Sequence, residues 1–185
     1  MIRRLERSGA ELRLGTEATQ ELAEELQPDV IVAALGAKAK RPDVPGGERA
    51  IMAADALRDI DSIGQTAAVI GGGLVGCEIA LQLGMTGRSV QLISRKKEVC
   101  RDAAYLNEAD CVAVTGNGAV IRTPDGSELE LKADSVIWAG GYLPMDDEAE
   151  QFRTLAYDFW KIGDCAQVRK IFNARREGYN AGSNI

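Results

Sequence analysis

The clearest pattern along the chain lies between residues 66 and 93, where an apolar run, a cluster of glycines, a helical stretch and a second apolar run follow one another. Residues 67–70 are Ala-Ala-Val-Ile, which is typical of a strand buried on both faces of a parallel sheet. Three glycines come next, and residues 74–85 favour a helix that ends before Gly87. Residues 89–93 form the second apolar run. This order predicts a βαβ unit.

Other runs predict strands on both sides of this unit. Residues 29–36 and 135–141 are apolar runs that end in glycine, as buried parallel strands often do. Residues 159–164 predict a strand that meets a turn, and residues 168–181 predict a helix. Shorter segments predict a strand near the N-terminus and three antiparallel strands, at residues 11–15, 111–114, 119–123 and 129–132. We therefore expect a Rossmann-like α/β fold of three layers, with a mostly parallel sheet and a small antiparallel β-meander.

Composition and charge narrow the classes of partner. The chain has 185 residues, 45% hydrophobic and 27% charged, which is ordinary for a globular α/β protein. A formal net charge of −6 argues against nucleic acid and anionic membranes as partners, because these need a concentrated positive field. The longest apolar runs fall far short of the roughly 20 residues that cross a bilayer. We expect a cytoplasmic protein that contacts neither nucleic acid nor membrane.

Histidine is absent, and the four cysteines are widely spaced without a Cys-x-x-Cys pair. These facts argue against His-based acid–base catalysis, a Cys/His nucleophile, a zinc site and a closely spaced iron–sulfur cluster. We expect reduced structural thiols, no metal site and no catalytic acid or base.

The glycines of the βαβ unit carry the strongest functional signal. Gly71, Gly73 and Gly76 form a G-x-G-x-x-G pattern that directly follows a predicted strand and opens a predicted helix. In a dinucleotide-binding turn the first glycine permits the tight turn, the second lets the backbone approach a pyrophosphate, and the third lets helix and strand pack closely. The phosphate would meet helix N-terminal amides. A purely structural glycine turn is the alternative.

The end of the second strand bears on the choice between NAD and NADP. An acidic residue is common at that point in NAD sites, about 20 residues after the first glycine. This chain has Ser94, Arg95 and Lys96 there. Arginine or lysine can pair with a 2′-phosphate and serine can hydrogen-bond it, so NADP(H) is favoured over NAD(H). A solvated basic loop is the alternative.

Two blocks resemble a known family. Residues 69–80, Val-Ile-Gly-Gly-Gly-Leu-Val-Gly-Cys-Glu-Ile-Ala, resemble the nicotinamide-domain signature of the flavoproteins with two dinucleotide-binding domains. Residues 162–165, Ile-Gly-Asp-Cys, with the segment up to Gly182, are similar to the C-terminal part of the old-yellow-enzyme-related NADH:flavin oxidoreductases. That group includes 2,4-dienoyl-CoA reductase and trimethylamine dehydrogenase.

The resemblance implies FAD as a second cofactor and adds residues to the site. Gly163 and Asp164 match the block in which the family's aspartate hydrogen-bonds the flavin ribityl or pyrophosphate region; a cap on the final helix is the alternative for Asp164. Glu78 would lie near the nicotinamide, although compensation of the helix dipole explains a carboxylate there equally well. Gly140 matches a crossover between the two domains. With these, the expected cofactor-binding set is Gly71, Gly72, Gly73, Leu74, Val75, Gly76, Glu78, Ser94, Arg95, Lys96, Gly140, Gly163 and Asp164.

The resemblance also implies a domain arrangement. Residues 60–143 would be a NAD(P)H-binding domain inserted between residues 1–59 and 144–185, two parts of an FAD-binding domain. The family's N-terminal FAD loop and its upstream FMN barrel do not match any part of this chain, and residues 95–111 are too few for a helix and a third parallel strand. We expect the nucleotide-binding region of an NAD(P)H:flavin oxidoreductase similar to enoate or dienoyl-CoA reductases, with an isolated non-catalytic dinucleotide-binding module as the alternative.

Overall fold

The computed structural model describes residues 5–96 and 105–185 and divides the chain into two compact units. Unit 1 comprises Met1–Ala37 and Pro144–Ile185, and unit 2 comprises Lys38–Leu143. The chain passes between them twice, through the short paired strands β2 (Ala37–Ala39) and β11 (Tyr142–Pro144). One unit is therefore an insertion within the other.

Unit 2 contains a five-stranded sheet in which every pairing is parallel. Its strands, in spatial order, are β3 (Ile51–Met52), β10 (Ser135–Trp138), β4 (Thr66–Ile70), β5 (Ser89–Ser94) and β6 (Tyr105–Asn107). A three-stranded antiparallel meander follows, made of β7 (Asp110–Thr115), β8 (Gly118–Arg122) and β9 (Glu128–Lys132). The mostly parallel sheet and the small meander are confirmed.

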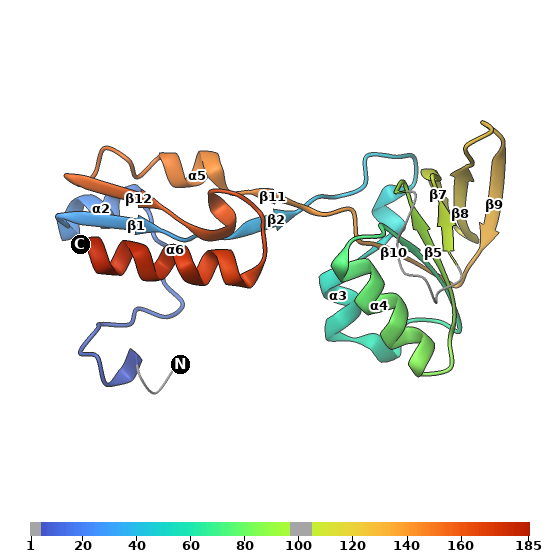
Figure 1. The fold of residues 1–185 in the computed structure, drawn as a ribbon, viewed down its shortest axis with the longest axis horizontal. Coiled ribbons are helices and arrows are strands. Elements are labelled where there is room, and N and C mark those ends of the chain that lie inside the picture. The colour runs from blue at the N-terminus through green and yellow to red at the C-terminus, as the bar shows by residue number, and fades with distance from the viewer. Residues whose placement is uncertain (1–4, 97–104) are drawn as a thin grey trace. The chain divides into compact units, whose positions relative to one another are not determined.

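The sheet of unit 2 is covered on both faces (Figure 1). Ala67 and Val69 of β4 pack with the helices α3 (Ala53–Arg58) and α4 (Leu74–Met85). Ala68 and Ile70 pack with apolar side chains of the meander. Because successive side chains of a strand point to opposite faces, a continuous apolar run is what a strand between two layers requires.

Local signals explain where α4 ends. Gly87 has a φ of +82°, a left-handed conformation that glycine adopts without steric cost. Its N–H donates to the carbonyl of Gly84, and the N–H of Arg88 donates to that of Leu83. These bonds satisfy carbonyls that the last turn of a helix leaves without partners.

Unit 1 is built on the parallel pair β1 (Val30–Ala33) and β12 (Asp158–Lys161). Its helices are α2 (Gln20–Leu26), α5 (Asp146–Glu150) and α6 (Ile171–Asn184), with a 3-10 turn at Gly163–Cys165. Ala33, Ala149 and Cys165 are buried together, with Phe159 packed against them. The predicted strands at 29–36 and 159–164 are thus confirmed, and the structure pairs them although they are far apart in sequence.

Three features differ from expectation. Residues 11–15 form no strand, since an alternating segment without a pairing partner has no acceptors for its amides. A third parallel strand does follow β5, because the three-residue β6 needs little chain. Residues 97–104, on which the question of a helix depends, lie outside the described residues. Unit 2 begins at Lys38 rather than at residue 60, because β3 pairs with β10 and α3 packs against its sheet.

Candidate dinucleotide-binding site

The glycine turn lies at the carboxyl end of β4, where the chain enters α4. Gly71 has a φ of +121°, and its N–H donates to the carbonyl of Ile93 at 2.9 Å. A Cβ at Gly71 would lie 2.3 Å from the carbonyl oxygen of Ala139, and a Cβ at Gly76 would lie 1.8 Å from that of Gly71. Both positions therefore require glycine for the turn and the helix to pack closely.

Gly73 differs from its neighbours in the motif. It is the N-cap of α4, with φ −80° and ψ −179°, and it makes no side-chain cap. Apart from Gly73 itself and its two chain neighbours, no described atom lies within 4 Å of a Cβ built at this position. The first amides of a helix have no acceptors within it, and the side-chain position of Gly73 beside them is open. The second glycine of the motif thus leaves room for a ligand to approach the backbone.

An open groove of about 680 Å³ runs along the carboxyl ends of the strands of unit 2. Ligands of open α/β sheets bind at this edge. The groove brings together many of the residues expected at the site, namely Gly71, Gly72, Gly73, Ser94, Arg95, Lys96 and Gly140.

The basic segment after β5 is ordered by its own serine. Ser94 is only 3% exposed, and its Oγ accepts the N–H of Lys96 at 3.1 Å. The Nε of Arg95 lies 3.6 Å from Oδ1 of Asp110, but both side chains are largely exposed, so this ion pair contributes little to stability. Arg95 and Lys96 both line the groove.

A second, smaller hollow of about 160 Å³ lies beside the same turn and is mostly apolar. Leu74 and Val75 line it together with Met52 and Tyr142. Gly73 and Trp138 line both the hollow and the groove, so the two spaces adjoin across the glycine turn. Gly76 lines neither space; it is buried and holds α4 against the turn.

Glu78 lies apart from these spaces. It is exposed, and it is the fifth residue of α4, whose first turn contains no acidic side chain. The interaction of a charge with the helix dipole falls off within the first turn, so the expectation that Glu78 compensates the dipole is wrong.

Gly163 and Asp164 lie in unit 1, at the end of β12. Gly163 has a φ of +70°, and its N–H donates to Oε2 of Glu177 at 2.8 Å. This bond, followed by the Arg169 guanidinium, lowers the pKa of Glu177. Oδ1 of Asp164 accepts the N–H of Arg169 at 3.1 Å, whereas the N-cap of α6 is Lys170 and has no side-chain cap. Asp164 therefore orders the loop before α6 rather than capping the helix.

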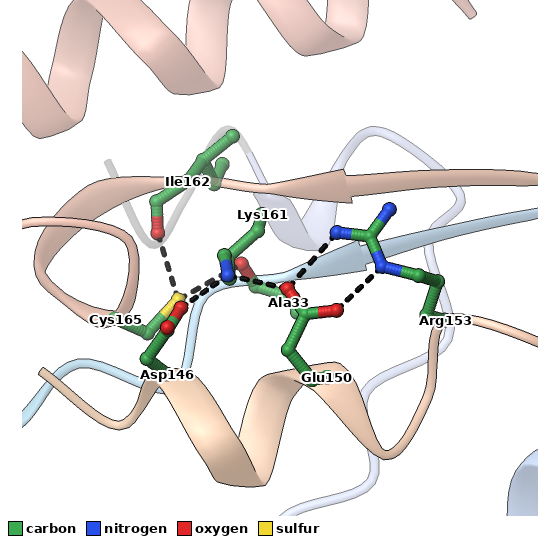
Figure 2. A network of polar contacts seen from close by, with 7 residues as sticks. All are labelled: Ala33, Asp146, Glu150, Arg153, Lys161, Ile162 and Cys165. Atoms are coloured by element: carbon green, nitrogen blue, oxygen red, sulfur yellow. Dashed lines mark hydrogen bonds and ion pairs between the residues drawn. The ribbon is translucent and has the colours of Figure 1, made fainter.

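Sequence reasoning missed a network of charges in unit 1 (Figure 2). Lys161 of β12 pairs with Asp146 and Glu150 of α5, and its side chain is only 19% exposed. Arg153 also binds Glu150, with its Nη2 2.9 Å from Oε1. Arg153 and then Lys161 lower the pKa of Glu150 to about 2, while Asp146 and then Glu150 raise that of Lys161. The network holds α5 against β12. No sequence motif indicates it, because Lys161 is 15 and 11 residues away from its two carboxylate partners.

The described residues also bear on metals and membranes. No group of three or more His, Cys, Asp or Glu side chains among them is arranged to hold a metal ion. Across residues 5–96 and 105–185, no helix has both the length and the apolar character of a membrane span.

Taken together, the parallel sheet, the glycine turn and the groove define unit 2 as a Rossmann-type dinucleotide-binding fold. The model of the pyridine nucleotide-disulphide oxidoreductase family matches residues 6–178, so the chain belongs to that family. FAD and NAD(P)H are the cofactors of this family.

Similarities to individual proteins agree with this family assignment. The chain is 28% identical to a cinnamate reductase of Clostridium sporogenes over 197 residues, covering 96% of this chain and 30% of that protein. It is 28% identical to an NADH oxidase of Thermoanaerobacter brockii, covering 98% of this chain and 32% of that protein. A structure of 2-naphthoyl-CoA reductase superposes with a TM-score of 0.85 at 27% identity, over 100% of this chain and 31% of that one. The resemblance to old-yellow-enzyme-related flavin oxidoreductases is confirmed.

Two facts about length follow from these relatives. The chain spans about a third of the length of each of these relatives. The match to cinnamate reductase extends over 197 residues, more than the 185 of the whole chain, so that relative contains residues that this chain lacks within the matched region.

Proposed function

We propose that unit 2 binds NAD(P)H and that unit 1 is part of an FAD-binding domain, so that hydride passes from the nicotinamide to the flavin in the whole protein. The observation that carries the proposal is the open room at Gly73, beside helix amides that have no acceptors within α4. Around it, the turn is closed tightly at Gly71 and Gly76. This combination of a tightly closed turn and unobstructed helix amides suits a pyrophosphate.

The two spaces beside the turn suggest how a dinucleotide lies. The pyrophosphate would sit at Gly72 and Gly73, and the adenosine half would lie in the groove toward Ser94. The nicotinamide would enter the apolar hollow at Leu74 and Val75. An uncharged dihydronicotinamide ring favours such a surface, whereas the ribose and phosphates need polar partners.

The far end of the groove favours NADP(H). Arg95 and Lys96 line it, and the Ser94 hydroxyl orders their backbone. An exposed guanidinium that is only weakly paired is free to form a bidentate contact with a 2′-phosphate. No acidic side chain follows β5 directly to accept a 2′-hydroxyl.

In unit 1, Asp164 and the turn at Gly163 would hold part of FAD. One Asp164 oxygen accepts a backbone N–H, and the half-buried carboxylate retains lone pairs for ribityl hydroxyls. When both cofactors are bound, NAD(P)H supplies the hydride and FAD accepts it, so the chain itself needs only to position them. The similarity to cinnamate reductase and 2-naphthoyl-CoA reductase supports a reductase of conjugated acids or thioesters as the whole protein.

The test is calorimetric titration of the chain with NADPH, NADH and FAD separately. We expect NADPH to bind more tightly than NADH, and Arg95→Gln with Lys96→Gln to weaken NADPH binding at least about tenfold while sparing NADH. A matched control, Arg58→Gln with Lys132→Gln, removes two exposed charges of unit 2 outside the groove. Equal affinities for NADPH and NADH would refute the NADP assignment, and no binding of either would refute the proposed function. Dinucleotide binding without FAD binding would favour a non-catalytic module.

A further inference from the structure

A short connection between β2 and β3 contributes to the lining of the groove. We call residues 40–46, Lys-Arg-Pro-Asp-Val-Pro-Gly, the strap. Lys40, Arg41, Asp43 and Val44 of the strap line the same groove as Gly71 and Gly73. No motif in this proline- and glycine-rich segment indicates a function, so the role of its two cations is unassigned.

The first end of the strap is fixed beside β10. The N–H of Lys40 donates to the carbonyl of Gly141 at 2.9 Å, and the indole N–H of Trp138 donates to the carbonyl of Lys40 at 3.0 Å. The indole occupies the space where a Cβ at Gly140 would lie, 2.3 Å from its Nε1. Gly140 thus leaves room for the side chain that holds Lys40.

The other end of the strap is fixed on the meander. The carbonyl of Pro45 accepts the N–H of Val114 at 2.8 Å. Gly46 has a φ of +74°, and a Cβ there would lie 1.9 Å from the carbonyl oxygen of Val114. Two prolines further restrict the backbone between these ends. The strap is therefore a preorganised segment, and ordering it costs little when a ligand binds.

The strap presents two exposed cations to the groove. Among the described residues, neither the Lys40 ammonium nor the Arg41 guanidinium has an ion-pair or hydrogen-bond partner. The acidic side chains that line the groove are Asp43 and Asp110, and Asp110 lies near Arg95. Two positive charges on a fixed backbone thus line the same groove as a turn whose own donors are uncharged amides.

We propose that Lys40 and Arg41, which line the same groove as the glycine turn, bind the pyrophosphate of the dinucleotide, with Trp138 as their positioning residue. In the sheet, β4 lies between β10 and β5. The strap starts beside β10, the glycine turn follows β4, and Arg95 and Lys96 follow β5. The Lys40 end of the strap therefore lies on the β10 side of the glycine turn, and the β5 cations, where the 2′-phosphate would lie, are on its other side.

This inference rests on the proposed function and deepens it, because it divides the cations of the groove between two phosphate groups. The β5 cations would distinguish NADPH from NADH. The strap cations would bind both, because both dinucleotides carry the same pyrophosphate. Charge-assisted hydrogen bonds to phosphate are about twice as strong as neutral ones, so losing two of them has a measurable effect on affinity.

The experiment compares three ligands by calorimetric titration: NADPH, NADH and ADP-ribose, which has the pyrophosphate but no nicotinamide. Lys40→Gln with Arg41→Gln should weaken all three by a similar factor, about tenfold or more. Arg95→Gln with Lys96→Gln should weaken NADPH alone. Arg58→Gln with Lys132→Gln, which makes the same change in net charge outside the groove, should change none of the three.

The outcomes distinguish a failure of the strap inference from a failure of the proposed function. Unchanged affinities in the strap variant, with normal binding by the unsubstituted chain, would overturn the strap inference and leave the proposed function standing. A loss confined to NADPH would also overturn it, by assigning the strap to the 2′-phosphate. No binding by the unsubstituted chain would overturn both. The single variants Lys40→Gln and Arg41→Gln, checked by their urea unfolding midpoints, exclude misfolding as the cause of a loss.

Discussion

The substitution Gly73→Ala separates binding from folding at the glycine turn. The backbone at Gly73, with φ −80° and ψ −179°, is accessible to alanine, and no described atom lies within 4 Å of the added Cβ. Alanine loses less backbone entropy on folding than glycine but is a poorer N-cap, and these effects oppose each other. We expect the free energy of unfolding to change by less than about 1 kcal/mol.

Gly73→Ala should affect the binding of NADPH much more than it affects the free energy of unfolding. The methyl group would occupy the open space through which a pyrophosphate reaches the first amides of α4. Loss of such charge-assisted hydrogen bonds costs about 1.5–3 kcal/mol, so the affinity for NADPH should fall at least about tenfold. The prediction is thus a binding defect in a chain that folds normally.

Two other glycines of α4 provide the comparison. At Gly76 a Cβ would lie 1.8 Å from the carbonyl oxygen of Gly71, so Gly76→Ala must displace the helix from the turn. Overpacking of this kind costs about 1–3 kcal/mol, against a gain in helix propensity of about 0.5–1 kcal/mol. At Gly84 no described atom lies near the added Cβ, so Gly84→Ala should retain only that gain.

The assay pairs urea unfolding with calorimetric titration for the three variants. The expected ranking of stability is Gly84→Ala, then Gly73→Ala, then Gly76→Ala, and the expected binding of Gly84→Ala is that of the unsubstituted chain. If Gly73→Ala bound NADPH with unchanged affinity, the reasoning that this space admits the pyrophosphate would be refuted. If Gly76→Ala were as stable as Gly84→Ala, the close approach to Gly71 would not constrain the fold.

Two further variants test other parts of the structure. The folded state lowers the pKa of the Glu150 carboxyl from 4.5 to about 2. The stability that the ionised carboxylate contributes is therefore full above pH 4.5 and is lost as the pH falls through about 2. Glu150→Gln should abolish this loss of stability in acid. Urea unfolding of both proteins as a function of pH checks this, and parallel pH profiles would contradict it. Trp138→Phe removes the indole N–H that holds Lys40, so NADH and NADPH affinities should fall together, by a smaller factor than when Lys40 itself is replaced. Unchanged affinities by titration would show that Trp138 has no positioning role.

The local pattern of the chain predicted the parts of the fold that depend on it. The strand, turn and helix at β4 and α4 were predictable because a fully buried parallel strand is uniformly apolar and the glycines mark the turn. The meander was predictable because short strands alternate with turn residues such as Gly126, which has a φ of +85°.

The very short strands were not predictable in this way. β3 and β2 have two and three residues, too few to display a period, and they exist because neighbouring strands offer them hydrogen-bond partners. This explains why unit 2 was expected to begin near residue 60. Neither the composition of residues 37–52 nor their prolines indicates that they pair with β10 and β11.

The residues of the candidate site likewise fall into those that the local sequence predicts and those that only tertiary contacts bring to the site. The spacing of glycines and the basic residues after β5 predicted residues that the structure brings into one groove. The strap cations and Trp138 could not be assigned, because the position of the strap depends on long-range hydrogen bonds. The carbonyl of Gly141 accepts the N–H of Lys40, the indole N–H of Trp138 donates to the carbonyl of Lys40, and the N–H of Val114 donates to the carbonyl of Pro45. Likewise, Lys161 follows an aromatic residue in a strand, and only tertiary contacts show that its ammonium meets two carboxylates of α5.

The central claim is that the glycine turn of unit 2 binds the pyrophosphate of NAD(P)H. Amide hydrogen exchange measured by mass spectrometry, with and without NADPH, tests it at the residues concerned. Our account predicts slower exchange in peptides that contain residues 71–76, 94–96 and 40–41, and unchanged exchange around residues 163–164 when NADPH alone is added. Binding of NADPH with no protection of residues 71–76 would contradict the account.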